Sequence, residues 1–522
     1  YVRLKNIWTE PSFIETKPCL NRRSAMNSIK KIRCFLNILM TLALACVGLL
    51  NILYKASVSY DMYEITSFKF LPQYFIYAFF FGIFLLLFLL IIMKFTEKQL
   101  FIICSVFYMF LIIYCLLNVK NPLRADQKFV YDAALQLMNG DFSSLEKSNY
   151  LYTYPNQLGL TAYDILLSLF SKNFEIIYLV NGIEILIINW TGYKITDCIF
   201  HNTATNKILI SLEFMFLPQF FYMLFAYGLI PGFCCIMIAF YCTLMLIQKG
   251  TAKYGIVTII FVFLACILKS NYQIGGIAVF IILTLHFFND KKRRHLLIAM
   301  IVLILSLTSG KIVATIYHSV TDMPQNSGVP SLLWIAMGTD LDNNLRAPGW
   351  YNQYNYNTYI DTDCDSEKSS KIARNKIQDN IVSSVKNPIK TVKFYTKKIV
   401  SMWCDPLFQS IWIGPIENTK DDVHSTFFLS LYERGIVNRS INRYMKCFVI
   451  IIFLSACYFR YKYRQNNSDL LYLYFLGGFV FHIFWEGKSQ YIYPYVFVLL
   501  PGCAYVLSKL TDILIKKKYK IS

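Results

Sequence analysis

The chain has 522 residues, of which 56% are hydrophobic, 17% aromatic and only 16% charged. A soluble chain carries roughly a quarter charged residues. The apolar excess here comes in blocks of about 18–24 residues, a length that crosses a bilayer. This composition excludes a soluble enzyme, a disordered protein and a small disulfide scaffold, and leaves a transporter, a channel or a membrane enzyme. The net charge of +20 is also typical of nucleic-acid binding, so the positions of the charges must decide.

The long apolar runs predict an all-α polytopic membrane protein with about twelve transmembrane helices and two large extracytoplasmic segments. The expected spans are residues 34–54, 74–93, 100–118, 176–195, 208–228, 231–248, 254–269, 272–288, 295–316, 442–459, 469–486 and 490–508.

Basic residues set the expected orientation, because they concentrate in short cytoplasmic loops. When the spans are counted alternately from a cytoplasmic N-terminus, every basic cluster falls on one side. Much of the positive charge is therefore expected near lipid headgroups, which argues against nucleic-acid binding. We expect a multi-pass protein of the cell membrane with both termini in the cytoplasm. The clusters include Arg22, Arg23, Lys30, Lys31 and Arg33, then Lys94 and Lys98, Lys194 and Lys207, Lys249 and Lys253, Lys291 to Arg294, Arg460 to Arg464, and Lys516 to Lys520.

The same count predicts the organisation of the chain. Most polar residues between spans fall on the extracytoplasmic face, where chemistry or recognition is expected. Two cysteines of the larger outward segment, Cys364 and Cys404, leave open whether a disulfide forms there. The expected parts are a basic cytoplasmic tail (1–33), two additional N-terminal spans (34–99), a membrane core (100–316) with the first outward loop (119–175), a large outward loop or lid (317–441), and the C-terminal spans with a basic tail (442–522).

The first outward loop contains a short amphipathic helix, predicted over 127–138 from the spacing of its apolar residues. The helix begins near Asp126, whose carboxylate can cap free backbone N–H groups, and ends at Gly140-Asp141. A tyrosine-rich loop follows over 150–159. The apolar stretch 160–171 is too short to span a membrane, so we expect it to lie along the interface.

This loop resembles the first extracytoplasmic loop of GT-C glycosyltransferases, and in particular of the bacterial, lipid-phosphosugar-dependent branch that includes protein mannosyltransferases and aminoarabinose transferases. The resemblance implies that Asp126 is the catalytic carboxylate. Two features differ: Gln127 stands where the family often has a second carboxylate, and two extra spans precede the family core.

Two further positions resemble the family. Lys269, between two predicted spans, stands where members commonly place a cation on the outer face. The run from Glu486 through Lys488 to Pro494 is similar to the bacterial pattern E-x-R/K-x-R-Y-x-x-P, with Gln490 where a second Arg is frequent.

Transfer of a sugar from a polyprenyl phosphate requires a carboxylate that accepts or steers the acceptor hydroxyl and cations that stabilise the leaving phosphate. Asp126 would supply the first, and Lys269, Lys488 and Arg124 the second. Each has an alternative role: Asp126 as a helix cap, the lysines as interfacial side chains, Arg124 as a helix-end anchor, and the tyrosines as an aromatic belt. The expected substrate-binding residues are Tyr152, Tyr154, Gln157, Trp350, Glu486 and Tyr491.

The second outward segment carries no catalytic motif of its own. Apolar residues at helical intervals over 366–400 predict a lid that rests on the membrane. Its elements Trp334-x-x-Met337-Gly338 and Gly349-Trp350 resemble parts of the large bacterial GT-C loops that cover the active site. His318 and His424 stand alone, so no metal site is expected there. The sequence identifies no cofactor and leaves a divalent metal open.

Three functions compete. The first is a glycosyltransferase that moves a sugar from a polyprenyl-phosphate donor to a cell-envelope glycan, lipid or protein, with no nucleic acid as partner. The second is a polysaccharide polymerase or ligase, which typically uses paired arginines that Arg346 and Arg374 do not form. The third is a lipid-linked sugar transporter or flippase, which would favour an internal repeat and charges at the membrane midplane. No repeat is evident.

Overall fold

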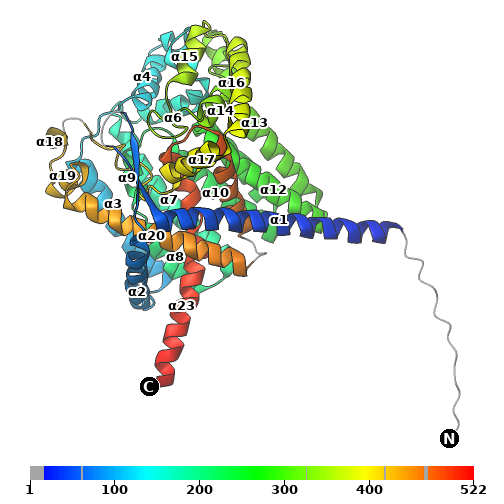
Figure 1. Ribbon diagram of the computed structural model, residues 1–522, viewed down its shortest axis with the longest axis vertical. Helices are drawn as coiled ribbons and strands as arrows, with labels where there is room; N and C mark the ends of the chain where they lie inside the picture. Colours follow the sequence, from blue (N-terminus) through cyan, green and yellow to red (C-terminus); the bar gives the residue numbers. More distant parts are fainter. Residues whose placement is uncertain (1–16, 60–62, 325, 417–418, 464–467, 522) are drawn as a thin grey trace, which may run out of the picture.

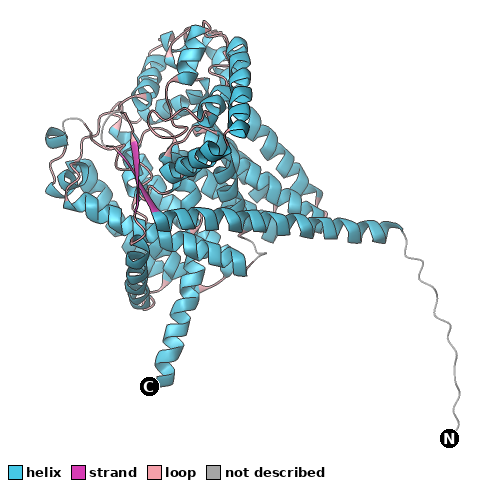
Figure 2. Cartoon of the chain, in the orientation of Figure 1, coloured by secondary structure: helices cyan, strands magenta, loops and turns pink. Residues whose placement is uncertain are grey.

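A computed structural model describes residues 17–59, 63–324, 326–416, 419–463 and 468–521. Helices make up 77% of the structure, and within the described residues Figure 2 shows a single two-stranded hairpin among them. The basic N-terminal residues from Lys17 onward belong to the long first helix, α1 (Lys17–Leu53), rather than to a separate tail. Of the predicted basic clusters, Arg464 lies outside the described residues.

In the part of the chain that the structure describes, eight helices are long and apolar enough to cross a membrane, which supports a helical membrane protein. The candidate span covers the helix over nearly its whole length in seven of them, whereas in α1 it begins only at Lys30. They are α1, α2 (Tyr74–Ile92), α3 (Glu97–Asn118), α7 (Glu175–Phe200), α10 (Leu229–Lys249), α12 (Gln273–Asp290), α13 (Arg293–Thr321) and α20 (Ile436–Lys462).

Two bent pairs raise the number of spans to ten if each pair crosses once. In the first, α8 (Thr203–Met215) meets α9 (Pro218–Phe221) and η3 (Tyr222–Leu224) at 47°. In the second, η5 (Ser489–Tyr491) and α22 (Tyr493–Phe497) meet α23 (Leu500–Ile521) at 48°.

Two shorter apolar helices, α11 (Ala252–Leu268) and α21 (Asp469–Phe484), match the two remaining predicted spans. Every predicted span therefore falls on a helix or a bent pair. The structure supports eight to ten crossings by length and composition, and the count of twelve stays a prediction.

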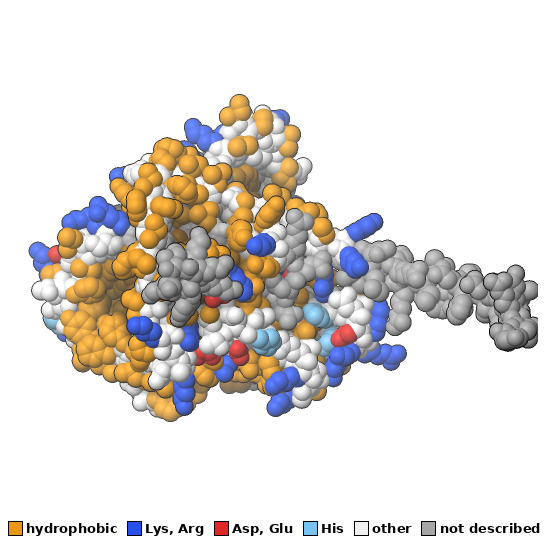
Figure 3. Space-filling view, turned by 90° about the horizontal axis from the view of Figure 1, so that it is seen from below, with side chains coloured by type: hydrophobic (Ala, Val, Ile, Leu, Met, Phe, Trp, Pro, Cys, Tyr) orange, Lys and Arg blue, Asp and Glu red, His pale blue; other side chains and the backbone are white. Residues whose placement is uncertain are grey.

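Large apolar side chains on the outside of the bundle indicate where lipid would lie. Phe79 and Phe84 of α2, and Phe107 and Phe110 of α3, are each more than 60% exposed. Exposed apolar surface on this scale is not found on soluble monomers. Seen from below in Figure 3, wide apolar areas alternate with Lys and Arg side chains. This surface suits a bilayer, whereas the sidedness of the chain stays a prediction.

The first two spans are integrated into the bundle. Helices α1 and α2 both pack against α20 near the other end of the chain. Tyr74 and Ala78 of α2 share a buried cluster with Cys447 and Ile450 of α20. The two N-terminal spans, expected as additions to a core, are thus joined to the C-terminal spans by shared apolar contacts.

The two large outward segments form one layer at the upper end of the molecule in Figure 1. Asn326 Nδ2 donates to the carbonyl of Tyr152 at 2.8 Å, and Lys147 pairs with Asp363 at 2.7 Å. The layer contains α4 (Asp126–Met138), η1 (Ser143–Leu145), α5 (Tyr150–Thr153), η2 (Pro155–Gln157), α6 (Leu158–Ser168), α14 (Ser331–Thr339), α15 (Tyr354–Asp361), α16 (Ser366–Lys386) and α17 (Pro388–Trp403), while η4 (Ser270–Tyr272), α18 (Thr419–Asp422) and α19 (Thr426–Tyr432) complete the chain.

The predicted helices of these segments are present with small changes. Helix α4 begins at Asp126 as expected, and α6 covers most of 160–171. The predicted lid helix is divided into α16 and α17 at Pro388, because a proline cannot continue a helix from the preceding turn.

A hairpin between the first two spans completes the outward layer. Strand β1 (Tyr54–Val58) pairs antiparallel with β2 (Thr66–Phe70). The backbone N–H of Ala56 donates to the carbonyl of Cys404 at 3.0 Å, and that of Thr66 donates to Arg346 at 3.0 Å. The hairpin is thereby fixed to the second outward segment.

The two outward cysteines are both buried and free. Cys364 lies in a cluster with Leu333 and Tyr359, whereas Cys404 lies in another cluster with Ala56 and Val400. The disulfide that the sequence left open is therefore not formed.

Candidate functional site

The site is built around Asp126, at the first residue of α4. The residue before it, Ala125, has a left-handed φ of 50° and offers no side-chain cap to the helix. Asp126 itself is exposed and interacts with the hydroxyl of Tyr150. The expected capping role is thus not seen, and the carboxylate points to other side chains of the outward layer.

Asp126 is close enough to act electrostatically on three charged residues that come from other parts of the chain. These are Lys269, Glu486 and Lys488. The structure therefore brings together the carboxylate, the two cations and the acidic residue that the sequence placed in one site.

Lys269 follows α11 directly and is held by Tyr227. Its Nζ donates to the carbonyl of Tyr227 at 3.1 Å and lies 4.4 Å from the centre of the Tyr227 ring. Burial and the positive charge of Lys488 together lower the pKa of Lys269 to about 7, against the attraction of Asp126 and Glu486. Near pH 7 Lys269 is therefore only partly protonated, and an anion beside it would favour the protonated form.

Tyr227 also links this lysine to the tyrosine-rich loop. Its hydroxyl lies 3.1 Å from that of Tyr150 and accepts a hydrogen bond from Gln157 Nε2 at 2.8 Å. The Tyr154 ring packs on Tyr150, with centroids 5.2 Å apart. Gln157 and Tyr154, both expected in the site, are thus fixed within one hydrogen-bond and aromatic network next to Asp126.

The last outward turn, 485–488, supplies the other charged residues. Burial raises the pKa of the Glu486 carboxyl to about 7, against the attraction of Lys488. Burial alone would lower the pKa of Lys488, but the Glu64 and Glu486 carboxylates hold it above its usual value. Tyr491, just after this turn, stacks on His482 with centroids 5.3 Å apart.

Glu64, on the loop of the hairpin, is the acidic partner that the sequence analysis missed. Its Oε1 lies 2.8 Å from Lys488 Nζ, and its Oε2 accepts from Arg346 at 2.6 Å. Gln409 Nε2 donates to Oε1 at 3.2 Å. One buried carboxylate therefore bridges two cations from different segments.

The last outward turn is supported from the second outward segment. Lys398 Nζ donates to the carbonyls of Gly338, Ile483 and Trp485 at 2.5, 3.0 and 2.6 Å. A Cβ on Gly338 would lie 2.5 Å from the Trp485 carbonyl oxygen, so only glycine permits this approach.

Trp350 also supports the last outward turn. Its ring is 1% exposed, its Nε1 donates to Ser401 at 2.8 Å, and its backbone forms a bridge with Gly487. The buried ring supports the turn and presents no open face for a sugar.

Two other expected site residues, Arg124 and Tyr152, have mainly structural contacts, although Arg124 shares the Trp412 ring with Lys488, whose Nζ lies 5.9 Å from its centre. Arg124 donates to the carbonyls of Gly414 and Trp412, and its guanidinium carbon lies 5.0 Å from the centre of the Trp412 ring, which suits an anchor of the chain. Tyr152 packs against the cluster of Leu333, which Tyr154 also contacts.

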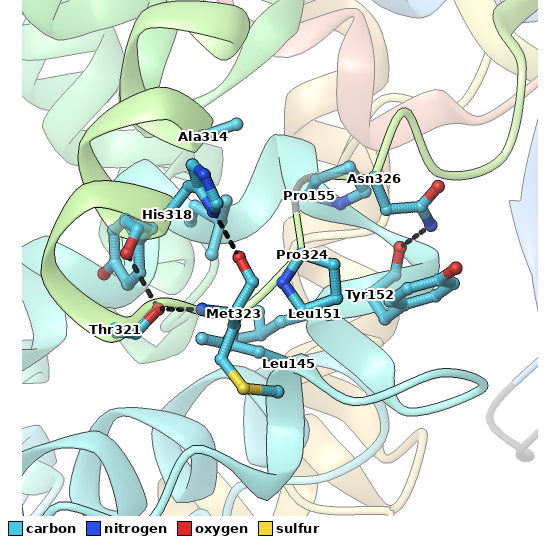
Figure 4. A pocket seen from close by; sticks show the side chains of 12 residues that line it. Leu145, Leu151, Tyr152, Pro155, Ala314, His318, Thr321, Met323, Pro324 and Asn326 are labelled. Atoms are coloured by element: carbon cyan, nitrogen blue, oxygen red, sulfur yellow. Dashed lines mark hydrogen bonds between the residues drawn. The ribbon is translucent and has the colours of Figure 1, made fainter.

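A small pocket lies beneath Tyr152, between the two outward segments (Figure 4). In it, His318 Nδ1 lies 2.6 Å from the carbonyl of Met323. The pocket has a volume of about 30 Å³, which is room for about two water molecules. It is too small for a sugar and carries no carboxylate, so we do not place the chemistry there.

Within the described ranges, no group of three or more His, Cys, Asp or Glu side chains is placed to hold a metal ion. Comparisons of the chain with protein-family models, with curated proteins and with solved structures find no match. The resemblance to GT-C glycosyltransferases therefore stays a prediction that depends on the residues named above.

Four contributors to the site were not foreseen: Glu64, Arg346, Tyr227 and Tyr351, whose ring lies 5.2 Å from the Arg346 guanidinium carbon. A signal existed for Glu64, since an acidic residue in a loop counted as outward is a candidate by the same reasoning as Asp126. Arg346 was considered only as part of a paired-arginine pattern.

Proposed function

We propose that the chain is an integral-membrane glycosyltransferase of the GT-C type. It transfers a sugar from a polyprenyl-phosphate donor to a cell-envelope glycan, lipid or protein on the extracytoplasmic face. The observation that carries the proposal is the convergence of an exposed carboxylate, Asp126, with Lys269 and Lys488 at one end of a bundle of apolar helices. Acid–base and anion-binding groups at that place suit a substrate with a lipid tail and a phosphate.

In this mechanism the acceptor oxygen attacks the anomeric carbon of the sugar, and the bond from that carbon to the phosphate oxygen breaks. Asp126 accepts the proton of the acceptor hydroxyl. Lys269 and Lys488 stabilise the negative charge that grows on the leaving polyprenyl phosphate. The tyrosines around Tyr227 offer hydroxyls and ring faces to the sugar.

Support also comes from the neighbours of Asp126. The carboxylate does not cap its own helix, so it is available for a substrate. In contrast, Asp132 on the same helix is paired with Lys128 at 2.7 Å on the exposed surface. The two aspartates differ in surroundings within two helical turns, which makes one the matched control of the other.

The test is a transfer assay on the full chain in lipid nanodiscs, with a panel of prenyl-phosphate sugars and an extract of envelope glycans as acceptors. Asp126→Asn should lower transfer by about 10²-fold or more, whereas Asp132→Asn should leave it unchanged. Full transfer by a folded Asp126→Asn variant would overturn the role of Asp126. Movement of a lipid-linked sugar between leaflets without a new glycosidic bond would overturn the function itself.

The sugar and the acceptor can be identified in cells. Glycan analysis of the envelope with and without the protein should show the loss of one side-chain sugar. Accumulation of unpolymerised lipid-linked units, or of polymer not linked to its acceptor, would instead favour a polymerase or ligase.

A further inference from the structure

We propose that Glu64 is an internal counter-anion of the site: its carboxylate occupies the anion position formed by Lys488 and Arg346, and a phosphate binds there only by displacing it. The proposal that the phosphate belongs to a prenyl phosphate rests on the proposed function. The competition itself depends only on the geometry of these three residues.

The first support is the way the charges are bridged. The two oxygens of Glu64 each meet a different cation, at 2.8 Å for Lys488 and 2.6 Å for Arg346. Two adjacent oxygens of a phosphate would meet the same pair of donors, since lysine and arginine both bind carboxylates and phosphates. The carboxylate therefore stands where a phosphate would be most strongly bound.

The second support is access. The side chain of Glu64 is 5% exposed, whereas those of Arg346 and Lys488 are 16% and 18% exposed. The cations are thus more open to the outside than the carboxylate that neutralises them. An anion that arrives from the outward face meets the cations first.

The third support is the position of the bridge relative to Asp126. The negative charge of Asp126, like that of Glu64, raises the pKa of Lys488. Asp126 also raises the pKa of Tyr351, which lies beside Arg346. A phosphate held by Lys488 and Arg346 would therefore lie near the proposed catalytic carboxylate. Glu64 comes from the hairpin of the two N-terminal spans, so these spans would contribute directly to the site.

The backbone of Glu64 makes displacement easier. Its φ is 53°, in the left-handed region that side chains other than glycine adopt at a cost. Its carboxylate is held by the ion pairs with Lys488 and Arg346 and by a hydrogen bond from Gln409 Nε2. An incoming phosphate that takes over the two cations leaves only the hydrogen bond from Gln409.

The experiment measures the binding of two probes, inorganic phosphate and farnesyl phosphate, to the full chain in phosphatidylcholine nanodiscs. In Glu64→Gln the competing charge is gone, so both probes should bind roughly tenfold more tightly than to the wild type. The matched control is Glu146→Gln, an exposed glutamate of the same outward layer, whose affinities should not change. Lys488→Met should abolish the gain in the Glu64→Gln background.

Equal or weaker binding of inorganic phosphate to a folded Glu64→Gln variant would overturn the inference and make Glu64 a fixed support of Lys488. If this variant does not fold, Glu64→Asp replaces it, because an aspartate is too short to meet both cations. An intermediate gain, about threefold, is then expected, and wild-type affinity would overturn the inference.

The proposed function and the counter-anion role of Glu64 can be disproved independently. A gain for both probes without any sugar transfer would leave the counter-anion in place and overturn only the transferase. A gain for inorganic phosphate alone would overturn the assignment of the position to a prenyl phosphate.

Discussion

Lys269 and Tyr227 are joined twice: the lysine Nζ donates to the tyrosine carbonyl at 3.1 Å and lies 4.4 Å from the centre of its ring. The same tyrosine hydroxyl accepts from Gln157. Carbonyl, ring and hydroxyl of one residue therefore connect the end of α11 with the tyrosine-rich loop that follows α4. This connection keeps Lys269 near Asp126, although the lysine is only partly protonated near pH 7.

The binding of a phosphate donor should depend on pH because of Lys269. With a pKa near 7, much of this lysine is neutral above pH 7, while a bound phosphate favours its charged form. Binding then takes up a proton, so affinity for farnesyl phosphate should fall by up to about tenfold for each pH unit above 7. The measurement is a titration of affinity between pH 6 and pH 9.

Two variants separate the groups that titrate in this range. Lys269→Arg keeps its charge at every pH and should remove most of the dependence. Glu486, with a pKa also near 7, gains negative charge as pH rises and contributes in the same direction, which Glu486→Gln should remove. An unaltered pH profile in Lys269→Arg would show that this lysine does not carry the effect.

Lys398 should be required for the stability of the last outward turn. Lys398→Met keeps most of the aliphatic stem but leaves the carbonyls of Gly338, Ile483 and Trp485 without their donor. A buried acceptor without a partner costs about 1–3 kcal/mol, so the unfolding temperature should fall and transfer should decline with it. The exposed Lys393→Met is the control, and equal unfolding temperatures for the two variants would contradict this role.

Gly338 should tolerate no side chain. A Cβ there would meet the backbone oxygens of Trp485 and Phe484 at 2.5 and 2.6 Å, and backbone atoms cannot move aside as a flexible side chain can. Gly338→Ala should therefore destabilise the protein by about 1–3 kcal/mol, as measured by thermal unfolding in nanodiscs.

Gly310 serves as the control for Gly338. A Cβ on Gly310, in α13, would meet no atom within 4 Å, and alanine favours a helix over glycine by about 1 kcal/mol. Gly310→Ala should therefore be neutral or stabilising. A loss of stability as large in Gly310→Ala as in Gly338→Ala would show that the close approach is not the cause.

The sequence was sufficient to predict the helices because their signal is local. Runs of apolar residues identified each membrane helix, and the spacing of a few apolar residues identified α4 and its first residue, Asp126. The break at Pro388 is also a local signal, but the apolar pattern on both sides of it favoured one helix. The number of crossings is not local, because short and bent helices leave it between eight and ten.

The site could be predicted only in part. Asp126, Lys269, Glu486 and Lys488 were predicted from short motifs that resemble those of GT-C glycosyltransferases and that lie close to apolar runs. Glu64 meets Lys488 and Arg346 through tertiary packing of a hairpin that carries no repeating pattern, and Trp350 is buried because Gly487 permits contact. Such pairings depend on which distant segments meet, and a single sequence does not record that.

The bridge between Glu64 and Lys488 also has a consequence for biosynthesis. During translation the hairpin emerges with the first two helices, whereas Lys488 emerges only before the last one. Until then Glu64 has no lysine partner, and the cation-binding face of the hairpin is incomplete. The ion pair with Lys488 therefore forms only after the helices that precede Lys488 have been made, and a chain interrupted before Lys488 lacks it.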